Sequence, residues 1–246
     1  MKIIASDYDG TLSFQGKISD EDKNAIELFR KNGGKFGIVT GRDLEQALWV
    51  VRDLKNRNLE IDYVACCTGA VILNSDGKII SMRKQKMASF FEDIIKYAKT
   101  LKLGSFCVSN ELVRCYVDAN SNIEHNLGAI SEFTQANAWF YSEEDAEKFV
   151  QYLREFQSDN LIGFRNGGSV DMPPVGVSKP IGILEYAKLF DEEAEIYTVG
   201  DNINDIPMLE AYESFAVSNA RDEVKKIAKH QCNRIADMIE CIMEAK

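Results

Sequence analysis

Short apolar runs alternate with helix-like segments in the first third of the chain. The runs KIIAS, KFGIV and DYVACC, and EIYTV further on, have the length of strands and are bounded by Gly, Asp or Thr. Between the first three lie SDEDKNAIELFRKNGG, which has a capping-box-like start and a closing glycine pair, and DLEQALWVVRDLKNR, which has apolar residues at helical spacing. This order predicts an α/β fold with a parallel sheet covered by helices on both faces.

Polar residues gather where these predicted strands end. Asp7 and Asp9 follow the first strand, residues 40–42 (TGR) follow the second, and Asp201 follows EIYTVG. Ligands bind at the carboxyl ends of the strands in sheets of this kind. The sequence therefore predicts an active site at this edge of the sheet.

The middle of the chain has a different pattern. AVILNSDGKII reads as a hairpin with Asp76-Gly77 as its turn, and a helix-like run follows from about residue 87 to 103. GSFCV and LVRCYVD form a predicted strand pair, SEEDAEKFVQYLREFQ a second capped helix, and LIGFRN and SVDMP a closing pair with a turn at Gly167-Gly168. We predict an α+β module at residues 72–174, inserted into a core formed by residues 1–71 and 175–246.

Composition and charge limit the possible partners. The 246 residues are 45% hydrophobic, enough to bury a core, and the formal net charge is -10. That charge argues against a nucleic-acid partner, although an acidic protein can bind a small phosphorylated metabolite through a lysine, a metal ion or amide donors. No apolar stretch has the length of a membrane span, so we expect no membrane partner. Nothing in the sequence indicates the oligomeric state.

Cysteine and histidine exclude further classes of site. The six cysteines show no CxxC and no zinc spacing, so we expect buried thiols, such as Cys66 and Cys67, and a reducing cytoplasm. The two histidines, His125 and His230, lie in polar surroundings where surface positions are expected. A histidine-rich metal site is therefore excluded, and a Ser-His-Asp triad is not expected.

The acidic residues at the strand ends suggest a metal site. Asp7 and Asp9 repel each other when desolvated, and GDNINDIPML adds Asp201 and Asp205 with Asn204 between them. Taken alone, the second pair could cap a helix. Together the four carboxylates predict an oxygen-rich site suited to Mg²⁺, which would compensate their charge.

Two further residues fit phosphoryl transfer. Thr40, beside the Gly41 amide, can hold a phosphate oxygen, although an isolated threonine there could instead cap the next helix. Lys179 precedes Pro180, which fits the first position of a helix, and an ammonium at a helix start makes an anion site. A solvated lysine is the alternative.

These residues form an ordered set of motifs. DYDGT (7–11), VTGR (39–42), SK (178–179) and GDNINDIPML (200–209) resemble the four motifs of the haloacid-dehalogenase-like (HAD) hydrolases. The large insertion between the second and third motifs is similar to that of the Cof-type, class IIB capped phosphatases. The resemblance implies a Rossmann-like core with a C2-type α+β cap. It also implies a Mg²⁺-dependent phosphomonoesterase for small phosphorylated metabolites, sugar phosphates first and nucleotide or cofactor phosphates such as FMN or pyridoxal phosphate next.

The resemblance also implies a role for each motif residue. Asp7 would be the nucleophile that forms an aspartyl-phosphate, and Asp9 the acid and then the base. Mg²⁺ would be bound by the side chains of Asp7 and Asp201 and by the Asp9 carbonyl, with Asn204 and Asp205 supporting the site and Asp205 orienting Lys179. The residues expected to contact the phosphate are Gly10, Thr40, Gly41, Arg42, Lys179 and Asn204.

The chain departs from the family pattern outside these motifs. Thr68 stands in CCTGA where asparagine is frequent, and Pro180 where glycine is common. VSNA at residues 217–220 replaces Met-Gly-Asn-Ala, and QCNRIADMIECI replaces a glycine-containing loop. These differences concern substrate-side contacts and the contact between cap and core.

Two alternatives to a phosphatase stay open from the sequence. A phosphomutase on sugar phosphates needs the same four motifs. A non-catalytic sensor of a phosphorylated ligand does not need both a nucleophile and an acid, so Asp7 and Asp9 weigh against it. Arg114, Arg165 and Asn166 of the inserted module could reach the leaving group, or could be ordinary surface residues.

Overall fold

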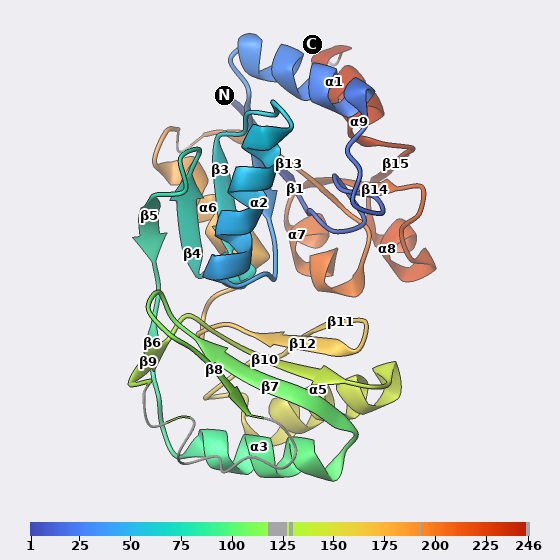
Figure 1. Ribbon diagram of the computed structural model, residues 1–246. Helices are drawn as coiled ribbons and strands as arrows, with labels where there is room; N and C mark the ends of the chain where they lie inside the picture. The colour runs from blue at the N-terminus through green and yellow to red at the C-terminus, as the bar shows by residue number, and fades with distance from the viewer. Residues whose placement is uncertain (118–126, 128–129, 192, 245–246) are drawn as a thin grey trace.

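The computed structural model describes residues 1–117, 127, 130–191 and 193–244, which form two main sheets, one above the other in Figure 1. His125 lies outside the described residues. His230 is exposed as expected, but it opens a short strand instead of ending a helix.

The larger sheet has eight strands. In spatial order they are β15 (His230–Cys232), β14 (Glu213–Val217), β13 (Glu195–Gly200), β1 (Lys2–Ser6), β2 (Lys35–Val39), β3 (Tyr63–Cys66), β4 (Val71–Asn74) and β5 (Ile79–Met82). The strands from β15 to β3 pair in parallel, and β4 and β5 are antiparallel additions at one edge. The predicted α/β class with a parallel sheet is confirmed.

Helices cover both faces of this sheet. They are α1 (Asp20–Lys31), α2 (Leu44–Asn56), α6 (Lys179–Lys188), α7 (Ile206–Ala211), α8 (Asp222–Ile227) and α9 (Ile235–Glu244). In Figure 1 α2 lies in front of the sheet and α6 behind it. Among the described residues, no helix combines the length and the apolar character needed to cross a membrane.

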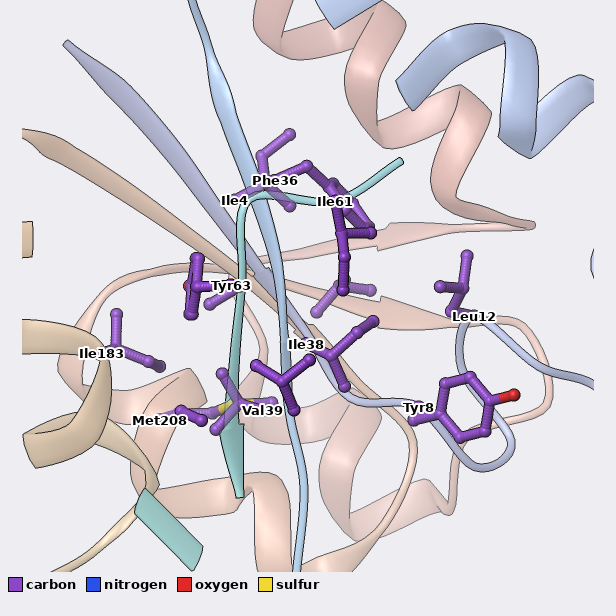
Figure 2. Packing of buried hydrophobic residues seen from close by; sticks show 14 of the residues in the cluster. Ile4, Tyr8, Leu12, Phe36, Ile38, Val39, Ile61, Tyr63, Ile183 and Met208 are labelled. Atoms are coloured by element: carbon purple, nitrogen blue, oxygen red, sulfur yellow. The ribbon is translucent and has the colours of Figure 1, made fainter. Parts of the chain in front are cut away.

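The buried core of the larger sheet comes from its central strands and the helices against them. Figure 2 shows Ile4, Val39 and Tyr63 from β1, β2 and β3, with Ile183 of α6 and Met208 of α7 nearby. The rings of Tyr63 and Tyr186 stack with their centroids 3.7 Å apart. Because both faces of these strands are buried, their sequences are almost continuously apolar.

The smaller sheet is antiparallel and has five strands. In order they are β11 (Phe164–Asn166), β12 (Ser169–Met172), β10 (Gln135–Phe140), β7 (Leu103–Ser109) and β8 (Arg114–Val117). The helices α3 (Phe90–Thr100) and α5 (Glu143–Phe156) pack on the face turned away from the larger sheet, around a separate hydrophobic cluster. A short pair, β6 (Gln85–Lys86) with β9 (Glu132–Phe133), lies beside this unit.

The structure corrects two expectations about the inserted module. The hairpin expected near its start, now β4 and β5, is hydrogen-bonded to β3 and completes the larger sheet. Its place is decided by pairing of β4 with β3, the strand directly before it in the chain, so β3, β4 and β5 follow one another at the edge of the sheet. The central strand β10 was not expected, because QANAWF contains residues with little preference for strands.

The structure resolves two of the alternatives left open by the sequence, one through a helix cap and one through burial. Asp43 caps α2 by accepting a hydrogen bond from the Gln46 amide at 3.0 Å, so Thr40 does not serve as that cap. The Ser19 and Ser142 hydroxyls accept from the amides of Asp22 and Asp145, as their spacing predicted. Lys179 is 1% exposed, so the solvated alternative for this lysine is wrong.

Candidate active site

The polar residues at the strand ends meet at the edge of the larger sheet that faces the smaller sheet. Asp7 follows β1, residues 40–42 follow β2, and Asp201 follows β13, while Lys179 opens α6. A cavity of about 200 Å³ lies between the two sheets, and Asp7, Asp9, residues 40–42 and Asn204 line its larger-sheet side. We call this side the floor of the cavity. The edge of the sheet chosen from the sequence is therefore where the structure has a cavity.

A buried lysine joins two carboxylates in the floor. The Lys179 ammonium donates to Asp7 Oδ1 at 2.7 Å and to Asp205 Oδ1 at 2.5 Å. Burial would lower the pKa of Lys179, but the charges of Asp205 and Asp7 outweigh it and the net pKa is raised. Burial raises the pKa of Asp7, and the neighbouring Lys179 ammonium offsets only part of that effect. The lysine is therefore a permanent cation in contact with Asp7.

Asp201 lies beside the DGT turn. Its Oδ1 accepts a hydrogen bond from the Thr11 hydroxyl at 2.7 Å, and burial raises its pKa to about 6. Gly10 has φ +86°, and a Cβ at this position would stand 2.5 Å from Asp201 Oδ2. Only glycine combines that backbone conformation with so close an approach. The Gly10 carbonyl also accepts from Asn219 Nδ2, and this asparagine agrees with the family pattern.

The Asp205 carboxylate accepts three hydrogen bonds from within the chain. Its Oδ2 accepts from the backbone amides of Asp201 and Asn202 at 3.0 Å each, and its Oδ1 accepts from Lys179. The capping interpretation of this residue is therefore correct, and it operates together with the contact to the lysine. Such a carboxylate orients its neighbours, and only Oδ1, which accepts one hydrogen bond, has capacity left for a metal ion.

The donor set fits a hard divalent cation. One carboxylate oxygen from each of Asp7, Asp201 and Asp205 lies within 4.8 Å of the others. The raised pKa values of Asp7 and Asp201 come from desolvation and neighbouring carboxylates, which a cation would relieve. All-oxygen ligands of this kind suit Mg²⁺. The Asp9 carboxylate lies outside this three-carboxylate group.

Arg42 holds the carboxylate of Asp9. Its Nε and Nη2 donate to the two Asp9 oxygens at 2.7 and 2.8 Å. The guanidinium lies 5.4 Å from the ring centroid of Tyr8 and 5.8 Å from that of Trp49, within cation–π range. The arginine expected to contact phosphate is thus occupied by the carboxylate expected to act as acid, while both line the cavity.

Thr40 is held by the backbone on both sides. Its amide donates to the Ala65 carbonyl at 2.9 Å, and its carbonyl accepts from the Thr68 amide at 3.1 Å. Its hydroxyl oxygen accepts from the Arg42 amide at 3.2 Å, which leaves the hydroxyl proton available to a ligand. Thr68 itself has φ +56°, a left-handed conformation that asparagine adopts more readily than threonine.

The smaller sheet supplies the opposite wall of the cavity, which we call the roof. Its lining residues are Cys107, Ser109, Arg114, Gln135, Asn137, Asn166, Ser169 and Asp171. Arg114 and Asn166 were candidates from the sequence, whereas Arg165 is absent from the lining and donates to Glu143 at 2.9 Å. Gln135, Asn137 and Asp171 were missed. Polar residues at alternate positions of β10 and β12 were the available signal.

The roof also touches the floor directly. Gln135 Nε2 donates to the Gly41 carbonyl at 2.5 Å, and Asn202 Nδ2 donates to Asn166 Oδ1 at 2.7 Å. At the rim, the Arg221 guanidinium donates to the Glu143 carboxylate at 3.0 and 2.5 Å. These contacts join the two units around the cavity.

Comparison with known proteins gives a consistent result. A family profile described as haloacid dehalogenase-like hydrolase matches residues 4–238. A Mycoplasma genitalium protein provisionally named a phosphatase is 22% identical over 291 residues, covering 100% of this chain and 91% of that protein. The structure of a haloacid dehalogenase-like hydrolase from B. subtilis is 20% identical with a TM-score of 0.77, covering 98% of this chain and 99% of that one. A HAD subclass IIB sugar phosphatase is also 20% identical with a TM-score of 0.77, covering 99% and 98%. At such identities the solved structures establish a shared fold.

Proposed function

The chain belongs to the haloacid dehalogenase-like hydrolase family, and from this premise we propose that it is a Cof-type, Mg²⁺-dependent phosphomonoesterase acting through an aspartyl-phosphate. Its substrates are small phosphorylated metabolites, sugar phosphates first. The observation that carries the proposal is the contact of Lys179 with Asp7 inside the three-carboxylate group. A buried cation beside a buried carboxylate both neutralises an incoming phosphoryl group and leaves the second carboxylate oxygen to attack it.

Asp7 performs the first chemical step of the proposed reaction. One of its oxygens bonds to phosphorus while the ester P–O bond breaks, and Asp9 gives its proton to the departing oxygen. In the second step a water oxygen bonds to phosphorus, Asp9 takes the water proton, and the bond from Asp7 to phosphorus breaks. Lys179 and the Thr40 hydroxyl donate to the phosphoryl oxygens throughout. When bound by Asp7, Asp201 and the Asp9 carbonyl, Mg²⁺ supplies additional positive charge for those oxygens.

The contact between Arg42 and Asp9 gives the cycle a resting state. With both Asp9 oxygens accepting from the guanidinium, this carboxylate cannot protonate a leaving group. Substrate entry must therefore turn Asp9 away from Arg42 toward the ester oxygen, and Asp9 must take up a proton from solvent before it can donate one. Arg42 can then donate to the transferring phosphoryl group from its place on the cavity wall, which commits its charge to that group.

The size of the cavity favours a small leaving group. Its volume of about 200 Å³ lies below the roughly 300–1,000 Å³ typical of pockets for drug-sized ligands. A monosaccharide is therefore a better candidate than FMN. The location of this chemistry in the cytoplasm, with no nucleic-acid or membrane partner, stays a prediction.

We also propose that the two sheets are the centres of two domains. The hairpin of β4 and β5 moves the start of the inserted cap from residue 72 to the segment between Met82 and Gln85. We place its end between Met172 and Lys179, where the segment from β12 to α6 returns to the larger sheet. Cap closure over the floor would exclude water from the phosphoryl group.

Phosphate release tests the proposed function. We expect the purified chain to hydrolyse p-nitrophenyl phosphate with Mg²⁺, to lose this activity with EDTA, and to recover it when Mg²⁺ is restored. A panel of phosphorylated metabolites then ranks the substrates. Conversion of a hexose 1-phosphate to its isomer without free phosphate would reassign the chain as a phosphomutase, and inactivity on every substrate would favour a sensor.

A further inference from the structure

The roof of the cavity carries a buried carboxylate that the proposed reaction does not use. Asp171 lies on β12, is 5% exposed and lines the cavity. Its Oδ1 accepts from Asn137 Nδ2 at 2.7 Å and from Gln135 Nε2 at 3.3 Å. Its Oδ2 accepts no hydrogen bond within the described part of the chain, although a carboxylate oxygen can accept two.

A second acceptor beside it is also unsatisfied. Gln135 is 3% exposed, and its Nε2 faces two acceptors, the Gly41 carbonyl and Asp171 Oδ1. These partners settle the orientation of the amide, so Oε1 is the atom left without a donor. Buried acceptors without partners cost free energy, which a ligand with matching donors recovers.

The position of Asp171 places it close to the bound phosphoryl group. A Cβ added at Gly41 would overlap Asp171 Oδ2, so this oxygen lies against the TGR turn that follows β2. Thr40 of the same turn is the expected phosphate donor. The leaving group of a substrate whose phosphate is bound at this turn would therefore lie next to Asp171.

The charges around the cavity are unequal. Among the described lining residues, Arg42 and Arg114 are the cations, and each is already paired, with Asp9 and with Asp43 at 2.9 Å. Asp171 has amide partners and no cationic partner in the described residues. Burial raises its pKa to about 6, so it remains mostly ionised at neutral pH. A second anion on the substrate would meet this charge without a free cation to compensate it.

From these contacts we propose that Asp171 is a specificity-determining residue. It accepts hydrogen bonds from hydroxyl groups of an uncharged leaving group, and its own charge repels leaving groups that carry a carboxylate or a second phosphate. This inference rests on the proposed phosphatase activity and adds the chemical class that the cap selects. The Gln135 carbonyl oxygen takes a further hydroxyl donor.

Substrate pairs that are matched in carbon skeleton and differ by one carboxylate test the proposal on the unchanged protein. We compare kcat/KM for sorbitol 6-phosphate with 6-phosphogluconate, and for glycerol 3-phosphate with 3-phosphoglycerate. The uncharged member of at least one pair should be favoured by about 10-fold or more, and should exceed p-nitrophenyl phosphate. Equal turnover within both pairs overturns the proposal, as does p-nitrophenyl phosphate being the best substrate of the set. Preference for glucosamine 6-phosphate over glucose 6-phosphate would also overturn it, because Asp171 would then select an amine.

Asp171→Asn separates selection from a merely structural role. The change keeps the size of the side chain and one acceptor but turns Oδ2 into an N–H donor. We expect the ratio of kcat/KM values within each substrate pair to fall by about 10-fold or more, a change that a merely structural loss would not produce. Equal losses on all substrates would assign Asp171 to structure alone.

Asp22→Asn is the matched control. Asp22 is an equally buried carboxylate that accepts from the Ala236 amide and does not line the cavity. This variant should keep the substrate preference of the unchanged protein. Failure of the underlying phosphatase assignment would look different, because p-nitrophenyl phosphate would then not be hydrolysed with Mg²⁺ at all.

Discussion

The floor and the roof of the cavity are built in different ways. The floor comes from loops that follow parallel strands, and its charged side chains are neutralised by one another, as Lys179 is by Asp7 and Asp205. The roof is one face of an antiparallel sheet, where polar side chains alternate with residues buried beneath it. Gln135 and Asn137 line the cavity, while Ala136 and Ala138 belong to the hydrophobic cluster.

This difference separates two tasks. The floor concentrates charge at one point, which suits the phosphoryl group that every substrate shares. The roof offers amides, hydroxyls and one carboxylate, which suit the part of the substrate that varies. Changes in the floor should therefore affect all substrates or the fold itself, whereas changes in the roof should be selective.

The largest expected effect follows from removing Asp7, the proposed nucleophile, from the floor. Asp7→Asn should lower kcat by at least about 1,000-fold on every substrate, because a carboxamide oxygen does not form the acyl phosphate. Phosphate release measures the loss, and circular dichroism verifies the fold. Activity close to that of the unchanged protein would remove Asp7 from the reaction and break the division between floor and roof.

The next effect concerns stability. Lys179→Met leaves Asp7 and Asp205 buried without their cation and should lower the free energy of unfolding by ~3–5 kcal/mol. Urea unfolding at pH 7 measures the change. Lys188→Met, at the exposed end of the same helix, is the control and should change little. Similar losses in both variants would mean that the buried ion pairs do not support the floor.

Asp171 makes the free energy of unfolding decrease as the pH rises, whereas an ion-paired carboxylate makes it increase. Its pKa is raised from 3.8 to about 6 by burial, so its contribution is fully present below pH 3.8 and is lost as the pH rises through 6. Asp171→Asn should therefore unfold like the unchanged protein near pH 4 and be more stable at pH 7, by up to ~3 kcal/mol. Urea unfolding from pH 4 to 8 measures both curves, and parallel curves would contradict the prediction.

The smallest effect lies at the rim, where the two units meet. Hydrogen bonds from Arg221 first, and from Arg165, lower the pKa of Glu143 to about 2, so this contribution is present above pH 4.5 and is lost as the pH falls toward 2. Because the Glu143 carboxylate is about half exposed, Glu143→Gln should cost at most ~1 kcal/mol. Salt should reduce the difference. A larger loss of unfolding free energy that does not depend on salt would mean that Glu143 contributes to stability like a buried residue, which would contradict the prediction.

The floor was predictable because its chemistry is local. Asp7, Thr40 and Asp201 each follow an apolar run of strand length, and parallel strands bring their carboxyl ends to one edge. The capped starts at Ser19 and Ser142 were recognisable for the same reason. Each depends on atoms within a few residues.

The roof was not predictable in the same way. Strand β10 exists because β7 and β12 pair with it on both sides, and QANAWF alone does not show that. Asp171, between Val170 and Met172, looks like one polar residue in an apolar strand. Only the cross-strand pair of Asp171 with Asn137 turns it into part of a wall.

By itself the amino-acid order determined the α/β sheet, the edge that carries the chemistry and the acidic residues that gather there. Tertiary structure decided that Arg42 holds Asp9 and that Asp171 faces the turn at residues 40–42. The physical reason is range. Periodicity, capping and strand ends act between near neighbours in the chain, whereas strand pairing and burial join residues whose separation leaves no periodic trace.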